Sequence, residues 1–147
     1  MPQSYVSNNI HIVFSTKERR PLIPANEQRR LWAYMAGIAK NAGATPMAIG
    51  GMPDHVHVLA ALPADLAIAK FVNVLKSNSS KWMGERGVEF GWQKGYAAFS
   101  VSSSNLESVT EYIENQAEHH KKRDFKQEFL ALLKGHRVPF DPRYVFD

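Results

Sequence analysis

The alternation of apolar and polar positions predicts a chain built from both strands and amphipathic helices. Near the start, Ile10, Ile12 and Phe14 fall on one face of an extended segment, and His11 and Val13 fall on the other. Later stretches space their apolar residues three and four apart, as a helix does. The expected elements, in chain order, are a strand at 7–16, a helix at 25–40, strands at 44–50 and 54–62, a helix at 65–83, a strand at 96–101, a helix at 106–120 and a short amphipathic run at 125–133.

This order of elements predicts a fold of the α+β class. It matches the ferredoxin-like split βαβ arrangement, a four-stranded antiparallel sheet with two helices on one face. The first and third strands would be central neighbours, and the helix at 106–120 would be appended at the C-terminal side. We expect residues 1–147 to form one domain with a basic tail after that helix. The fold alone does not decide the activity.

Composition narrows the classes of function. The chain has 147 residues and no cysteine, which excludes a disulfide framework, a thiolate metal site and a cysteine nucleophile. No run approaches the ~18 apolar residues of a membrane span, and the start lacks the pattern of a signal peptide. We therefore expect a cytoplasmic protein without a membrane partner. A formal net charge of +4 permits binding to a polyanion such as nucleic acid.

Two histidines in the third predicted strand are the first candidates for chemistry. Residues two apart on a strand share a face, so His55 and His57 project side by side with Cα atoms ~7 Å apart. Two such imidazoles can chelate one divalent ion. The other interpretation is a pair of hydrogen-bonded or exposed histidines. His11, on the neighbouring central strand, is a possible stand-in ligand.

The helix at 106–120 supplies the second group of candidates. Tyr112 and Gln116 are four residues apart and therefore lie on one helical face. Spacing alone favours the other interpretation, in which Tyr112 packs against the open sheet face and Gln116 is a solvated surface residue. His119 and His120 lie two turns beyond Tyr112 and are either spare ligands or basic surface.

Three blocks of sequence together resemble one known family. They are Gly51–Leu59, which contains both histidines, Trp92–Val101 with its Trp-Gln-Lys-Gly-Tyr start, and Tyr112–Gln116. In order and spacing they resemble the single-tyrosine HUH transposases of small bacterial insertion sequences, together with relatives associated with repeated extragenic palindromes. The likeness runs from about Tyr5 to Lys122 and would make the chain a transposase-like catalytic domain.

The resemblance implies a DNA transposase that cuts and rejoins single-stranded DNA at hairpin-flanked ends. Tyr112 would be the nucleophile that forms a 5′-phosphotyrosine, and His55, His57 and Gln116 would hold the metal. Such a nitrogen and oxygen donor set suits Mg²⁺ or Mn²⁺. A phenol with a pKa near 10 needs such help at neutral pH. The resemblance also implies a homodimer in which the tyrosine helix of one subunit can complete the active site of the other.

Contacts to DNA are less localised in the sequence. The candidate phosphate-binding cations are Arg19, Arg20, Lys76, Lys81, Lys94, Lys121, Lys122 and Arg123. Three aromatic residues are candidates for stacking on unpaired bases: Trp92, Tyr96 and Phe99. For at least two of them, packing in the core is the better interpretation. The alternative function is a domesticated, non-catalytic module that binds hairpin nucleic acid. An RNA-recognition domain is disfavoured because the central strand carries histidines, and a relaxase is disfavoured by the small size.

Overall fold

A four-stranded antiparallel sheet forms the centre of the computed structural model, which describes residues 4–147. The strands are β1 (Asn9–Ser15), β2 (Thr45–Met52), β3 (His55–Ala61) and β4 (Ala97–Ser100). Their order in the sheet is β2-β3-β1-β4, and each neighbouring pair is antiparallel. The predicted α+β, ferredoxin-like arrangement with β1 and β3 as central neighbours is therefore confirmed.

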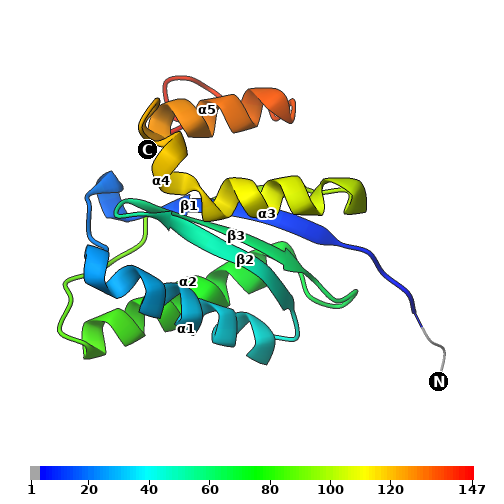
Figure 1. Cartoon of the computed structure of the whole chain (residues 1–147), viewed down its shortest axis with the longest axis horizontal. Helices are drawn as coiled ribbons and strands as arrows, with labels where there is room; N and C mark the ends of the chain where they lie inside the picture. Colours follow the sequence, from blue (N-terminus) through cyan, green and yellow to red (C-terminus); the bar gives the residue numbers. More distant parts are fainter. Residues whose placement is uncertain (1–3) are drawn as a thin grey trace.

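Two helices, α1 (Gln28–Asn41) and α2 (Ile68–Glu85), cover one face of this sheet (Figure 1). A short 3₁₀ turn, Ala25–Glu27, precedes α1. The sheet presents Ile12, Phe14 and Val58 to these helices, and all three are at most 1% exposed. Alternate residues of β1 and β3 thus form the main core, and the residues between them face the other way.

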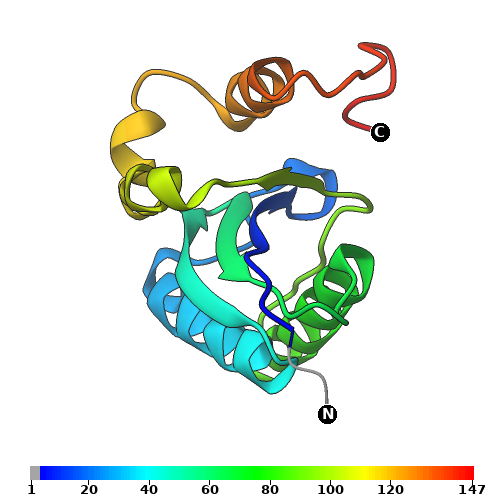
Figure 2. The same ribbon diagram turned by 90° about the vertical axis from the view of Figure 1, so that its right-hand side faces the viewer.

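The second face of the sheet is covered as well. Three helices lie over it, α3 (Leu106–Glu114), α4 (Gln116–His119) and α5 (Phe125–Gly135), with α5 above the C-terminal end of α3 (Figures 1 and 2). Here Leu59 packs with Ile113 of α3, and Val13 packs with Phe125 of α5. His55 and His57 point to this face, away from α1 and α2 as expected.

The predicted single helix at 106–120 is wrong in one respect, because it is interrupted. Asn115 has φ −106° and ψ 33°, which ends α3 and starts the short α4 at Gln116. The next helix, α5, begins with a capping box in which Asp124 accepts from the backbone N–H of Gln127 at 2.9 Å. The chain thus turns at Asn115 and again before Asp124, and these turns bring α5 back over the sheet.

Gly50 in β2 allows α3 to lie directly on the sheet. A Cβ atom at this position would stand 2.5 Å from the carbonyl oxygen of Ile113, far inside van der Waals contact. The close approach fixes the height of α3, and hence of Tyr112, above the strands. None of the helices within residues 4–147 is long and apolar enough to cross a membrane.

Candidate active site

The two histidines of β3 lie at the centre of the covered face. In the strand pairing His57 is opposite Val13 of β1 and Gly50 of β2. Both histidine side chains are fully buried beneath the C-terminal helices. Their rings therefore meet groups of the protein and not bulk water.

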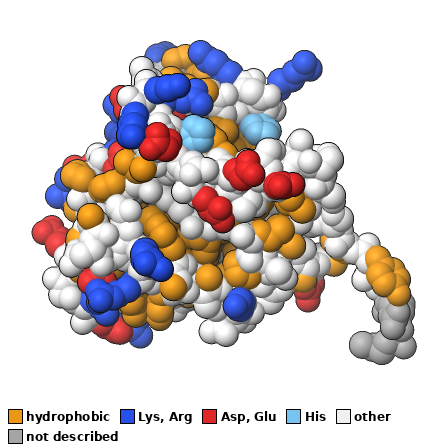
Figure 3. All heavy atoms as spheres, viewed as in Figure 1, with side chains coloured by type: hydrophobic (Ala, Val, Ile, Leu, Met, Phe, Trp, Pro, Cys, Tyr) orange, Lys and Arg blue, Asp and Glu red, His pale blue; other side chains and the backbone are white. Residues whose placement is uncertain are grey.

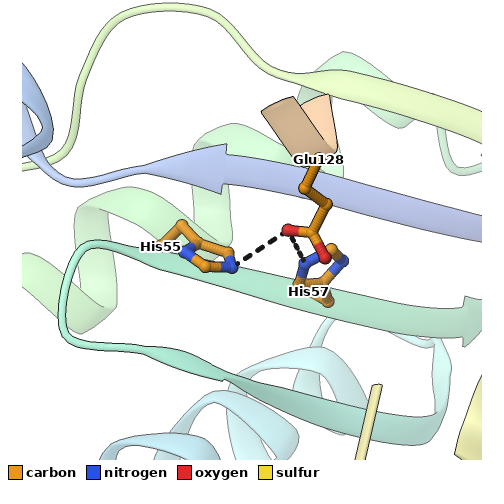
Figure 4. A group of neighbouring side chains, drawn as sticks. All are labelled: His55, His57 and Glu128. Carbon is orange, nitrogen blue, oxygen red and sulfur yellow. Dashed lines mark hydrogen bonds and ion pairs between the residues drawn. The ribbon is translucent and has the colours of Figure 1, made fainter. Parts of the chain in front are cut away.

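Glu128 of α5 is the residue on which both histidines converge (Figure 4). Its Oε1 lies 3.2 Å from Nε2 of His55 and 3.1 Å from Nε2 of His57. Nε2 of His120 reaches the same oxygen at 3.1 Å. Glu128 is only 1% exposed, so this carboxylate is stabilised by the imidazoles around it rather than by solvent.

Gln116 completes the cluster from the start of α4. Its Oε1 accepts from Nε2 of His55 at 3.0 Å, and its Nε2 donates to Oε2 of Glu128 at 3.2 Å. The structure thus brings the predicted His55, His57 and Gln116 together within one chain. A carboxylate oxygen is added to them, and His55, His57 and Glu128 offer ligand atoms that all lie within 4.8 Å of one another.

These donors fit a divalent cation. Two imidazole nitrogens, an amide oxygen and a carboxylate oxygen form the mixed set that suits Mn²⁺, and oxygen donors also suit Mg²⁺. A cation between them would replace the hydrogen-bonding protons that now separate the nitrogens from the oxygens. The buried positions and the converging Nε2 atoms make this the candidate metal site.

Tyr112 reaches the same carboxylate from α3. Its hydroxyl donates a short hydrogen bond to Oε2 of Glu128, and its ring packs edge-on against His57 with 5.7 Å between centroids. A cavity of about 320 Å³ opens beside the phenol, and Arg123 and His136 are among the residues that line it. The candidate nucleophile therefore faces both the metal donors and a space that a substrate can enter.

Each metal-facing histidine has a further partner behind it. Nδ1 of His55 donates to Oδ1 of Asp54 at 2.7 Å, and Nδ1 of His57 lies 2.8 Å from Nε2 of His11. His11 is thus not placed as a ligand, because it contacts the side of His57 that faces away from Glu128. The rings of His11 and His57 stack with centroids 5.1 Å apart.

The buried charges of the cluster shift one another's pKa values. Burial opposes a charge on His55, but hydrogen bonds to Asp54 and Glu128 outweigh it and raise the pKa of His55 to about 9. Burial also raises the pKa of Tyr112 above its usual value, and Glu128 adds to that effect. For Glu128, burial works against the charge, yet the bonds from His55, His57 and Tyr112 hold its pKa well below its usual range. The cluster is therefore a buried ion pair of His55 and Glu128 beside a protonated phenol.

The two remaining candidate histidines, His119 and His120, have different surroundings. His120 joins the cluster through Gln116 and Glu128, at 3.1 Å from each. His119 instead packs its ring on Tyr112, with centroids 4.5 Å apart. The sequence could not separate these neighbours, because their places depend on the break at Asn115.

The candidate DNA-binding cations do not form one group. Arg123 lines the cavity beside Tyr112. Lys76 donates to the carbonyl oxygens of Gln93 and Gly95, Arg19 donates to that of Phe146 at 2.8 Å, and Lys121 pairs with Glu118 at 3.0 Å. Exposed side chains are found at Arg20, Lys81, Lys94 and Lys122, and Lys81 lies on α2 over the opposite face of the sheet. In Figure 3, Lys and Arg side chains gather over the end of the molecule that carries α4 and α5, whereas acidic ones gather along α3.

The three candidate aromatic residues also separate. Trp92 packs edge-on against Phe14 and donates from its indole nitrogen to Ser79 at 2.9 Å. Phe99 is 4% exposed and belongs to the cluster beneath α5, whereas Tyr96 is 41% exposed. Two of the three are thus packing residues, and only Tyr96 is free to meet a base.

In this structure a tyrosine faces a histidine pair on a ferredoxin-like sheet, and in these features the chain resembles the single-tyrosine transposases. The chain belongs to the IS200-like transposase family, whose model, described as "Transposase IS200 like", matches residues 4–116. These are DNA-cleaving and strand-transferring enzymes. The match ends at Gln116, so α5 and Glu128 lie beyond it.

Individual relatives agree with this assignment. The chain is 27% identical over 120 residues to the transposase for insertion sequence element IS200 of Salmonella typhimurium. The match covers 76% of this chain and 78% of that protein. It is 26% identical over 119 residues to the ISDra2 transposase TnpA of Deinococcus radiodurans, and that match covers 72% of this chain and 81% of that protein.

Two solved structures are similar to this one. A candidate transposase of Deinococcus radiodurans R1 superposes with a TM-score of 0.62 at 26% identity, over 79% of this chain and 96% of that one. A REP-associated tyrosine transposase bound to a REP hairpin superposes with a TM-score of 0.57 at 15% identity, over 77% and 68%. The second likeness bears on the fold alone.

Proposed function

We propose that this transposase cuts and rejoins single-stranded DNA through a covalent 5′-phosphotyrosine at Tyr112, with the help of a divalent metal. One observation carries the proposal. The hydroxyl of Tyr112 and the Nε2 atoms of His55 and His57 all meet at the carboxylate of Glu128. A nucleophile and a set of metal donors thus face one point, as in-line attack on a phosphodiester requires.

The cation would be held by His55, His57 and Gln116, as the family resemblance implies, and by Glu128, which the geometry adds. We propose Mg²⁺ or Mn²⁺ from the donor types. When bound, such an ion supplies Lewis-acid stabilisation for the charge that builds on the phosphate oxygens. Arg123, in the wall of the adjoining cavity, can neutralise the same phosphate from the solvent side.

In the proposed cleavage step, the phenolic oxygen of Tyr112 bonds to phosphorus and the bond from phosphorus to the 3′-oxygen breaks. The phenolic proton leaves to water in the adjoining cavity, and the departing 3′-oxygen takes a proton from water. The products are a 5′-phosphotyrosine and a free 3′-hydroxyl. Because the covalent link keeps the phosphodiester energy, another 3′-hydroxyl can attack it later and rejoin the strands.

The proposed substrate is a DNA hairpin with the cleavage site on a flanking single strand. The hairpin bound to the similar REP-associated transposase supports this class of DNA. With a DNA substrate of this kind, the proposed location of the reaction is the cytoplasm. We propose a homodimer, as the family resemblance implies. Each chain would complete its own site, because Gln116 bonds to His55 and both Tyr112 and His57 bond to Glu128 within one chain.

The test is a covalent adduct with hairpin DNA whose flanking strand is labelled at the 3′ end, in the presence of Mn²⁺. The wild-type chain should retain the label through denaturing electrophoresis, because the 5′-phosphate stays on Tyr112. Tyr112→Phe should lose the adduct and still bind the hairpin. Tyr34→Phe, which changes a tyrosine of α1 on the opposite face of the sheet, is the matched control. An adduct formed by Tyr112→Phe would refute the assignment.

A second candidate, the non-catalytic hairpin-binding module, is favoured by one observation. His55 and His57 are fully buried, and Glu128 already occupies the hydrogen bond of Tyr112. A site closed in this way would suit a protein that binds DNA without cutting it. That function predicts hairpin binding by the wild-type chain with no adduct at any Mn²⁺ concentration.

A further inference from the structure

The two metal-facing histidines differ in the groups that support them. Each ring directs Nε2 toward Glu128, and each has a partner for Nδ1 on the other side. For His55 the partner is the carboxylate of Asp54, at 2.7 Å. For His57 it is a third imidazole, His11, at 2.8 Å from β1.

A metal-binding imidazole offers one lone pair, so its other nitrogen carries a proton that needs an acceptor. That acceptor selects the tautomer and fixes the orientation of the ring. Asp54 meets this need for His55. At His57 the hydrogen-bond partner of Nδ1 within residues 4–147 is Nε2 of His11, which fills the role.

The surroundings of His11 hold it in place. In the sheet it pairs with Leu59 of β3 and Phe99 of β4, and it is only 3% exposed. Its ring stacks on that of His57 at an interplanar angle of 28°. As an imidazole, His11 adds no further carboxylate to a site in which Glu128 is already buried.

An imidazole also suits both states of the site. Here Nε2 of His57 donates to Glu128, so Nδ1 of His57 accepts a hydrogen bond from Nε2–H of His11. With Nε2 of His57 holding a cation, its Nδ1 would have to donate a hydrogen bond. Nε2 of His11 would accept that bond in the tautomer of His11 that carries its proton on Nδ1, and both rings would be neutral.

We propose that His11 is a positioning residue for the metal site, which sets the tautomer and orientation of His57 as Asp54 does for His55. The inference rests on the proposed function in that it requires a cation at His57. It adds a residue that neither the family resemblance nor the metal cluster includes.

The test compares His11→Leu with His11→Gln by calorimetric titration with Mn²⁺ and by thermal unfolding in EDTA. Leucine fills the space without a polar atom, whereas the amide of glutamine can reach the position of Nε2 and can either accept or donate. His11→Leu should weaken Mn²⁺ binding about 10- to 100-fold. His11→Gln should restore most of the affinity, although both variants alter the packing.

Equal Mn²⁺ affinity in the wild type and His11→Leu would overturn the inference, and so would equal weakening in both variants. Should His11→Leu not fold, ¹⁵N NMR of the wild type decides, since a coupling across the hydrogen bond between His11 and His57 is expected and its absence refutes it. Failure of the wild-type chain to bind Mn²⁺ at all would count against the proposed function instead.

Discussion

Replacing Gly50 by alanine should separate the tyrosine from the metal donors without touching either. The substitution places a methyl group 2.5 Å from the carbonyl oxygen of Ile113 and 3.2 Å from its Cγ2. Because the first of these contacts is with backbone, no side-chain rotation can relieve it. The helix α3 must move away from β2, and Tyr112, the residue before Ile113, must move with it.

The size of the effect follows from the contact. Ordinary van der Waals separation requires α3 to retreat by about 0.9 Å at this point. A displacement of about 1 Å at a reacting group costs on the order of 100-fold in rate. Overpacking of this kind also costs about 1–3 kcal/mol of stability, or roughly 2–10 °C in Tm for a chain of this size.

The assay is the initial rate of adduct formation with saturating hairpin DNA and Mn²⁺, alongside thermal unfolding. Gly37→Ala is the matched control, because a Cβ at this position of α1 meets nothing within 4 Å. It should keep the wild-type rate and gain about 0.5–1 kcal/mol of helix stability. A Gly50→Ala chain with both the wild-type rate and the wild-type Tm would refute the claim that this contact sets the height of Tyr112.

Three other predictions concern the buried cluster. In EDTA, the raised pKa of His55 should contribute about 3 kcal/mol to the free energy of unfolding at pH 6.5, and this contribution should be lost as the pH rises through about 9. Urea titrations at pH 6.5 and about pH 10 measure the difference, and equal stabilities at the two pH values would contradict the prediction. Glu128→Gln should weaken Mn²⁺ binding about tenfold or more in calorimetry, since a charged donor becomes neutral; unchanged affinity would remove Glu128 from the site. A mixture of Tyr112→Phe and His57→Ala chains should form no more adduct than either chain alone, because each site uses one chain's residues; recovered activity would place the tyrosine in the partner's site.

The sheet could be predicted from the sequence because its two central strands carry a strict two-residue alternation. Ile12 and Val58 go to the main core, whereas His11 and His57 go to the other face. This periodicity is local, so no knowledge of distant contacts is needed. The order of strands and helices along the chain then predicted the ferredoxin-like strand order. The alternation predicted that the histidines would face away from α1 and α2.

Glu128 was missed because its role depends on where α5 is placed. The amphipathic run at 125–133 predicts a helix but does not say which face of the sheet it covers. The available signal was an acidic residue between Phe125 and Phe129 on the apolar side of that run, and such a residue needs a buried partner. Its partner His57 lies 71 residues away in the chain, beyond the reach of local patterns.

The helix break at Asn115 could not be predicted from the sequence for a similar reason. Residues 106–120 are compatible with one continuous helix, and the tertiary contacts of Gln116 decide otherwise. Once Gln116 bonds to His55 and Glu128, the chain must leave the axis of α3. That turn separates His120, which joins the cluster, from His119, which packs on Tyr112.

The most direct measurement is mass spectrometry of the chain after reaction with a hairpin-flanked single strand and Mn²⁺, followed by tryptic and nuclease digestion. The account predicts that a nucleotide 5′-phosphate is attached to the peptide spanning residues 95–121, with fragment ions placing it on Tyr112. Attachment at another residue, or cleaved DNA with no attached nucleotide, would contradict it.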